Sequence, residues 1–143
     1  MVPKYRGKTI KGLLVVGYVS VVTDKRAGVE PGTYISNSVG FPFAYEVDPK
    51  TVGQSTGLKD KNGVEVFQGD IVKVTDEDEE YSYISVVKNY AEEGYPAFDI
   101  EYPSDWEYES NALSTIMSGG YETIEIIGNI YENPELLEQT YEN

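Results

Sequence analysis

The chain has 143 residues, 25 of them acidic and 11 basic, with a net charge of −14 and neither cysteine nor histidine. These absences exclude disulfides, zinc sites built from cysteine or histidine, thiol catalysis and a histidine general base. The length suits one domain, or one barrel with a small appended lobe, and is sufficient to bury a core without metal or disulfide staples.

A basic segment opens the chain: residues 1–28 contain six basic residues and one acidic residue, a net charge of +5. The apolar run 13–22 follows the first bases and superficially resembles a signal peptide. However, the run is β-branched, contains Gly17 and Ser20, and meets no small-x-small cleavage site before Thr23. We interpret it as a strand with a buried flank. Because the run is also too short to span a bilayer, we expect no membrane anchor.

The remainder of the first 52 residues has the pattern of short strands and turns. Turn residues occur at 31–32 (Pro-Gly) and at 37–38 (Asn-Ser), and the aromatic segment 41–49 is typical of an edge strand. We predict an N-terminal β lobe over residues 1–52 and a second unit over residues 53–143.

The clearest local pattern lies at residues 54–74. Asp-Lys-Asn-Gly at 60–63 favours a tight hairpin or a bulged four-residue loop, since Asn-Gly tolerates positive φ. A second break at Gly69-Asp70 precedes the β-branched run 71–74. The pattern predicts strand, turn, strand, turn, strand. A Gly-Asp turn before Ile-Val-Lys-Val is also typical of the first strands of SH3-like barrels, as an analogy at the level of fold.

Later elements follow from the same reasoning. We expect strands at 64–67, 71–74, 81–89, 97–102 and 124–130. A short C-terminal helix is predicted from Asn133 as cap, Pro134 at the first position and Glu135 near the positive end of the helix dipole. It should end by Thr140. A weaker helix, a single turn, is expected within 110–117.

Two segments, QSTGLKDKNGVEVFQGDIVKV at 54–74 and IEIIGNIYENPELL at 124–137, resemble the YopX family of bacteriophage and prophage proteins. Looser likeness occurs around 4–8 and 46–54. The resemblance implies a mainly β fold: a small, partly open SH3-like β-barrel with an N-terminal β lobe and a short C-terminal helix. The shared motifs are turns and strand cores, so the resemblance implies no catalytic residue, metal ligand or cofactor. Six residues are predicted to meet backbone requirements, namely Asn62, Gly63, Gly69, Asp70, Gly128 and Pro134.

Charge is divided along the chain. From Thr75 onward eighteen acidic residues stand against Lys88 alone, a net charge of −17. Opposite poles of this size either contact each other within a subunit or meet between subunits, which favours head-to-tail homo-oligomers. A merely solvated acidic surface is the alternative. The lack of cysteine is typical of a reducing cytoplasm, so we expect a cytoplasmic protein of a bacterial host.

The acidic run 76–80 raises the question of metal binding. Asp76, Asp78 and Glu80 alternate, and in an extended strand they would share one face and offer oxygen ligands to calcium or magnesium. The EF-hand pattern is absent, because Tyr81 stands where that loop needs glycine and Val87 where it needs glutamate. We expect a solvated hairpin tip and leave a bound metal ion open.

Aromatic residues crowd the later part of the chain, which has thirteen tyrosines in all. Tyrosine and tryptophan are enriched in protein contact surfaces, although small β-barrels also use tyrosine for cross-strand and rim packing. The candidate partner surface has Trp106 as its foremost member. Its six residues are Trp106, Tyr102, Tyr108, Tyr95, Asp105 and Glu107.

The leading functional hypothesis is a non-enzymatic phage or prophage accessory protein that contacts itself and a host protein. The net charge of −14 argues against direct nucleic-acid binding, which needs a basic face. An alternative is an acidic mimic of DNA that occupies a host DNA-binding protein. A third hypothesis, a small enzyme that uses carboxylates, has few candidate residues because histidine and cysteine are absent.

Overall fold

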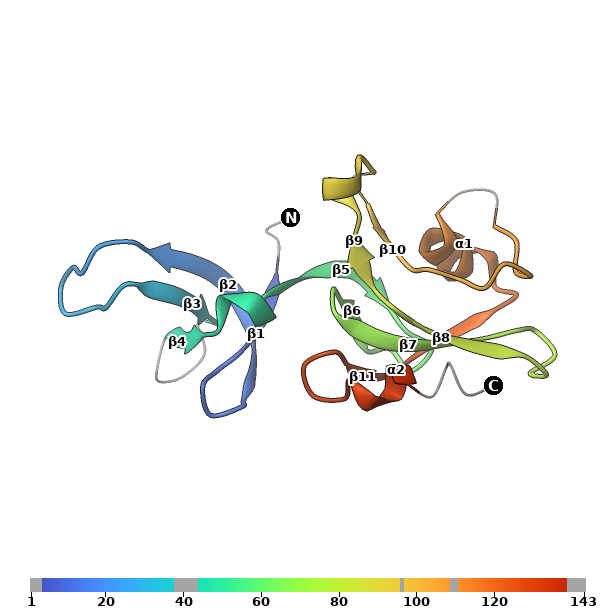
Figure 1. Cartoon of the computed structure of the whole chain (residues 1–143), viewed down its shortest axis with the longest axis horizontal. Helices are drawn as coiled ribbons and strands as arrows, with labels where there is room; N and C mark the ends of the chain where they lie inside the picture. Colours follow the sequence, from blue (N-terminus) through green and yellow to red (C-terminus); the bar gives the residue numbers. More distant parts are fainter. Residues whose placement is uncertain (1–3, 38–43, 96, 109–110, 139–143) are drawn as a thin grey trace. The chain divides into compact units, whose positions relative to one another are not determined.

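The computed structural model describes residues 4–37, 44–95, 97–108 and 111–138. It divides into two compact units, Met1–Ser55 and Thr56–Asn143. Most of the ordered elements are strands, and they pair antiparallel (Figure 1). The prediction of a mainly β protein is confirmed.

The first unit is a twisted antiparallel sheet with the strand order β4-β3-β2-β1-β5. The strands are β1 (Tyr5–Lys8), β2 (Leu14–Val22), β3 (Gly32–Ser36), β4 (Ala44–Val47) and the first residues of β5 (Gly53–Lys59), with a 3-10 turn at Pro49–Thr51. The apolar run at 13–22 forms β2. Its Val15 packs with Ile35 and Val47 into a small core, because alternate residues of a strand point to the same face.

The β2–β3 hairpin ends in a two-residue turn. Ala27 and Gly28 have successive positive φ values of 51° and 81°, as in a type I′ turn. The N–H of Val29 donates to the carbonyl of Arg26 at 2.8 Å, and the N–H of Arg26 donates back at 3.3 Å. The tip therefore carries a basic residue immediately before the turn.

The second unit is built on a three-stranded sheet with the order β11-β7-β8 (Figure 1). Its elements are β6 (Glu65–Phe67), β7 (Asp70–Thr75), β8 (Ser82–Val86), β9 (Lys88–Asn89), β10 (Phe98–Asp99), α1 (Ala112–Gly119), β11 (Thr123–Asn129) and α2 (Glu135–Glu138), with a 3-10 turn at Ala91–Glu93. Apolar residues of β6, β7 and β8 form the main core with α1 and with Ile124 of β11.

The helix α1 is longer than predicted, since it has eight residues rather than a single turn. The side chain of Asn111 caps it by accepting the N–H of Ser114 at 2.8 Å. Burial supplies most of the stability that the local sequence lacks, because Leu113 and Ile116 pack into the core. The C-terminal helix α2 starts just after Pro134, and the predicted end at Thr140 lies outside the described residues.

Two predicted strands are shorter than expected. The segment 81–89 is interrupted at Val87, whose N–H donates to the carbonyl of Asp70 at 3.0 Å. The carbonyl of Val87 in turn accepts the N–H of Gly69 at 2.9 Å, so β8 ends at Val86 and β9 begins at Lys88. In the segment 97–102, Phe98–Asp99 forms the strand β10, paired with β9.

The strands of the described residues form open antiparallel sheets and no closed barrel. The SH3-like arrangement stays a prediction. Within the described part of the chain, no helix is long and apolar enough to cross a membrane.

The first three predicted turn residues lie in loops around β6. Gly63 has a φ of 81° and follows Asn62 in the five-residue loop between β5 and β6. The Asn62 side chain donates to Glu125 Oε2 at 3.2 Å. Gly69 has a φ of 95° and lies in the turn between β6 and β7, where an added Cβ would be 3.1 Å from the Tyr131 ring.

The other three turn residues lie at the start of β7 and at or just after the end of β11. Asp70 is fully buried, and its Oδ2 accepts the N–H of Phe67 at 2.8 Å. Gly128 lies at a register shift of β11, and a Cβ there would be 2.5 Å from Asn133 Oδ1. The carbonyl of Pro134 accepts the N–H of Leu137 at 3.1 Å.

Candidate protein-binding surface

Four aromatic rings form a connected network in the second unit. Tyr83 of β8 meets Trp106 edge to face, with ring centroids 4.7 Å apart. Tyr102 meets Tyr108 in the same way, also at 4.7 Å. The hydroxyls of Tyr83 and Tyr108 lie 2.9 Å apart, and the Tyr108 hydroxyl donates to Glu122 Oε2 at 2.6 Å. Edge-to-face pairs of this kind add stability beyond the area they bury.

Burial keeps the two inner tyrosines of this network protonated. Burial first, and then the hydrogen bond to the Glu122 carboxylate, raise the pKa of Tyr108 far above its ordinary value. Burial also raises the pKa of Tyr83. Because the Tyr108 proton is donated to Glu122, the Tyr83 hydroxyl is the donor of the bond between the two tyrosines. Both hydroxyls therefore act as neutral hydrogen-bonding groups at physiological pH.

The structure brings together most of the predicted partner surface but not as a single exposed patch. Trp106 and Tyr108 are half-buried and pack against the main core, so each offers a partner only part of its ring. Tyr95 makes its contacts elsewhere: its ring meets Tyr90 at 5.9 Å and its hydroxyl donates to Asp99 Oδ2 at 3.1 Å.

The exposed part of Trp106 lines a hollow of about 380 Å³. The hollow is formed by two segments distant in sequence, the tip of the β7–β8 hairpin and the loop after β10. Its lining residues are Asp76, Tyr81, Asp105, Trp106 and Glu107. We call it the Trp106 hollow. Sequence reasoning identified Asp105, Trp106 and Glu107 but missed the contribution of the hairpin tip.

Asp76 shapes the hairpin tip. Its Oδ1 accepts the N–H of Glu80 at 2.9 Å and that of Tyr81 at 3.2 Å. Glu79 adopts a positive φ of 59°, which closes the turn. The acids of this run lie in a hairpin tip rather than an extended strand, and no three acidic side chains converge as metal ligands within the described ranges.

The electrostatic character of the Trp106 hollow is strongly negative. It contains three carboxylates, and among the described residues none of them has a cationic side chain within ion-pairing distance. Lys88, the one base after residue 74, pairs with Glu101 at 3.6 Å. Because no ion pair neutralises these carboxylates in the described part of the chain, a positive group on a partner is the natural complement of this site.

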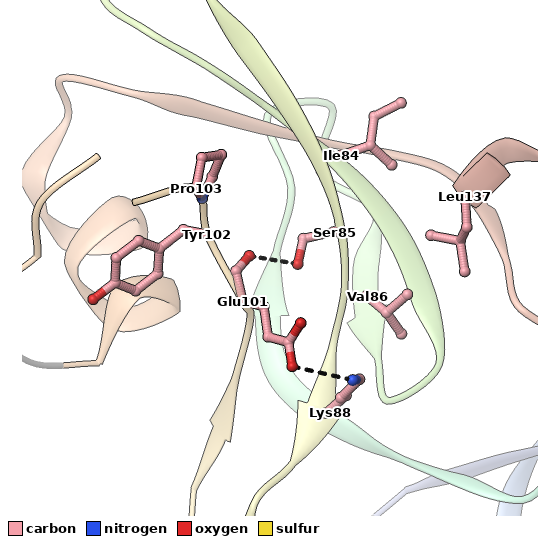
Figure 2. A pocket seen from close by; sticks show the side chains of 8 residues that line it. All are labelled: Ile84, Ser85, Val86, Lys88, Glu101, Tyr102, Pro103 and Leu137. Atoms are coloured by element: carbon pink, nitrogen blue, oxygen red, sulfur yellow. Dashed lines mark hydrogen bonds and ion pairs between the residues drawn. The ribbon is translucent and has the colours of Figure 1, made fainter. Parts of the chain in front are cut away.

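A second hollow, of about 300 Å³, lies beside β8 (Figure 2). Figure 2 shows Glu101 between the side chains of Ser85 and Lys88. Ser85 Oγ donates to the carbonyl of Glu101 at 2.6 Å, so its proton is held by a backbone group. The chain has no histidine to act as a base for this serine. The arrangement fixes the segment after β10 against β8 and provides a structural role for these residues.

Exposed apolar side chains gather in the first unit. Ile10 is fully exposed at the β1–β2 turn, Val21 is 69% exposed, and Val16 and Tyr18 are exposed on the face of β2 opposite the core. Single exposed apolar side chains are common on protein surfaces, but several of them gathered in one small unit are typical of contact sites. No sequence pattern distinguished them from core residues in advance.

Together, the two β units define a small, mainly β protein whose second unit carries an acidic, aromatic hollow. A family model described as "YopX protein" matches residues 17–138, and the chain belongs to the YopX family. This confirms the family predicted from the two sequence segments.

Individual relatives support the same assignment. The chain is 37% identical over 73 residues to the "SPbeta prophage-derived uncharacterized protein YopX" of Bacillus subtilis (strain 168), a match that covers 51% of this chain and 50% of that protein. The chain thus matches about half the length of this curated relative.

Two solved structures resemble the whole chain. Protein EF1440 from Enterococcus faecalis has a TM-score of 0.53 and 28% identity, covering 96% of this chain and 99% of that one. The crystal structure of yopX from Bacillus subtilis has a TM-score of 0.58, with 95% and 98% coverage. At 20% identity the second likeness shows the fold alone.

Proposed function

We propose that this chain is a phage or prophage accessory protein that acts by binding proteins, including other copies of itself, and catalyses no reaction. Membership of the YopX family, and a relative described as prophage-derived, support the genetic setting. The proposed site of action is the bacterial cytoplasm, in keeping with a chain free of cysteine.

The unequal charge of the two units carries this proposal. The unit Met1–Ser55 has seven basic and four acidic residues, whereas Thr56–Asn143 has four basic and twenty-one acidic residues. Net charges of +3 and −17 make the two units electrostatically complementary. Complementary surfaces steer association and select orientation, so contact between the first unit of one copy and the second unit of another is favoured.

The exposed apolar residues of the first unit support contacts beyond electrostatics. Its core has three buried apolar side chains, Val15, Ile35 and Val47, while Ile10 and Val21 are left largely in water. A small unit buries a low fraction of its apolar surface alone. Burial of these side chains against a partner would add hydrophobic stabilisation of about 25 cal/mol per Å².

The test is a pull-down of tagged protein from bacterial host lysate, washed in low and in moderate salt, with bound proteins identified by mass spectrometry. Untagged copies of this chain, co-expressed at equal level, should be recovered in the low-salt wash. Failure to recover untagged copies in either wash would contradict self-association.

A second candidate function, acidic mimicry of DNA, is favoured by the acid-rich second unit. Its carboxylates are spread over the tip at 76–80 and the loop that contains Asp105 and Glu107, and all of these except the half-buried Asp76 are solvent-exposed. A stoichiometric host DNA-binding protein in the same pull-down, displaced by duplex DNA and lost as salt rises, would place mimicry ahead of self-association.

A further inference from the structure

We infer that the Trp106 hollow receives the basic tip of the β2–β3 hairpin of a second copy, with the Arg26 guanidinium on the Trp106 ring. The inference rests on the proposed self-association and names the contact that produces it. Each side of the contact has independent structural support.

The hollow has the chemistry of a receptor for a guanidinium group. A half-buried indole lines it together with the side chains of Asp76, Asp105 and Glu107. Asp76 Oδ1 accepts two backbone N–H groups of the hairpin tip. An indole face attracts a cation, most often arginine, and carboxylates accept paired hydrogen bonds from the planar guanidinium. Tyr81, 68% exposed at the rim, adds a second ring for apolar contact.

The hairpin tip has the complementary form. The two-residue turn at Ala27-Gly28 makes it narrow and convex, and Arg26 precedes that turn directly. Lys25 is paired with Glu30 at 2.9 Å, whereas Arg26 is exposed and has no ion-pair partner in the part of the chain that the structure describes. Val29, across the turn, is 42% exposed and provides an apolar neighbour.

The net charges of the two units indicate that a second copy of the chain occupies the Trp106 hollow. The tip belongs to the unit with a net charge of +3 and the hollow to the unit with −17, so the two sites attract each other between molecules. The contact joins different surfaces of the two copies. Repetition therefore gives a ring if the rotation closes and a filament if it does not.

The test uses charge exchange across the contact, with the molar mass of each full-length variant measured by light scattering over a concentration series. Arg26→Glu alone should weaken association roughly tenfold or more, because it places like charges together. Asp105→Arg with Glu107→Arg should do the same. The chain that carries all three substitutions should regain association. Lys50→Glu, the same charge change at another exposed base of the first unit, is the matched control and should leave association close to wild type.

Emission from Trp106, the sole tryptophan, gives a second readout. In the wild type it should shift with concentration in parallel with the molar mass, and in Arg26→Glu it should not. Wild-type association without rescue in the triple variant would overturn the Arg26 contact and leave the proposed function standing. If the emission shift returns in the triple variant while its molar mass stays that of a monomer, a second copy is not the occupant of the hollow. A monomeric wild type would overturn both.

Discussion

The carboxylate of Asp60 joins the β5–β6 turn to β11: its Oδ2 accepts the N–H of Ile126 at 3.0 Å, across 66 positions of sequence. Its Oδ1 accepts the N–H groups of Asn62 and Val64, both at 2.9 Å. One buried side chain therefore closes the turn and fixes it to the central sheet of the second unit.

Asp60→Asn is predicted to destabilise the protein by about 2 kcal/mol, the usual range for hydrogen bonds to a charged group. Asparagine has one acceptor oxygen. It can accept the N–H groups of the turn or the N–H of Ile126, whereas the carboxylate accepts both. Urea unfolding followed by circular dichroism measures the difference. An equal free energy of unfolding in the two proteins would contradict the role assigned to this carboxylate.

The same residue predicts a pH dependence. Burial alone would raise the pKa of Asp60, but backbone donors from Ile126, Val64 and Asn62 outweigh it and hold that pKa below its ordinary value. A lowered folded-state pKa contributes stability above the unfolded-state pKa of about 4, and this contribution is lost as the pH falls through the folded-state pKa. The stability gap between wild type and Asp60→Asn should be full at pH 6 and shrink in acid. A gap that stays constant to pH 3 would refute the lowered pKa.

Ala27→Gly is predicted to stabilise the protein by about 0.5–1 kcal/mol, because alanine at a φ of 51° is strained and glycine is not. The gain is the net of relieved strain and the greater chain entropy of glycine in the unfolded state. Gly28→Ala, the reverse change at the neighbouring position, should destabilise. Thermal unfolding would show the two variants moving in opposite directions, and movement in the same direction would rule out the type I′ geometry.

Gly63→Val is predicted to destabilise by about 2 kcal/mol through backbone strain at a φ of 81°. No heavy atom lies within 4 Å of the added Cβ, so steric contact contributes little. Lys61→Val introduces the same side chain in the same loop without a positive φ and should change stability far less. An unchanged melting temperature in Gly63→Val would contradict the turn described here.

The parts of the fold that the sequence predicted are those set by local chemistry. Asn62-Gly63 and Gly69-Asp70 mark turns whose conformation depends on the residues themselves. The helix α1 was underestimated because its stability comes from burial of Leu113 and Ile116, which depends on the rest of the fold.

The site was predictable only in part for a related reason. Trp106 and its acidic neighbours stand out in sequence, but Asp76 and Tyr81 join them through the β7–β8 hairpin. The link from Asp60 to Ile126 is a long-range contact of the same kind, with no local signature. The strain at Ala27 was also hidden, since alanine gives no indication of a positive φ.

We propose that this protein acts through contacts between copies whose units are oppositely charged. Sedimentation equilibrium of the wild type, over a range of concentrations in low and in high salt, tests it most directly. In low salt the mass should exceed the 16.0 kDa of one chain, and it should fall toward that value as salt rises. A mass of one chain at every concentration and salt level would contradict it.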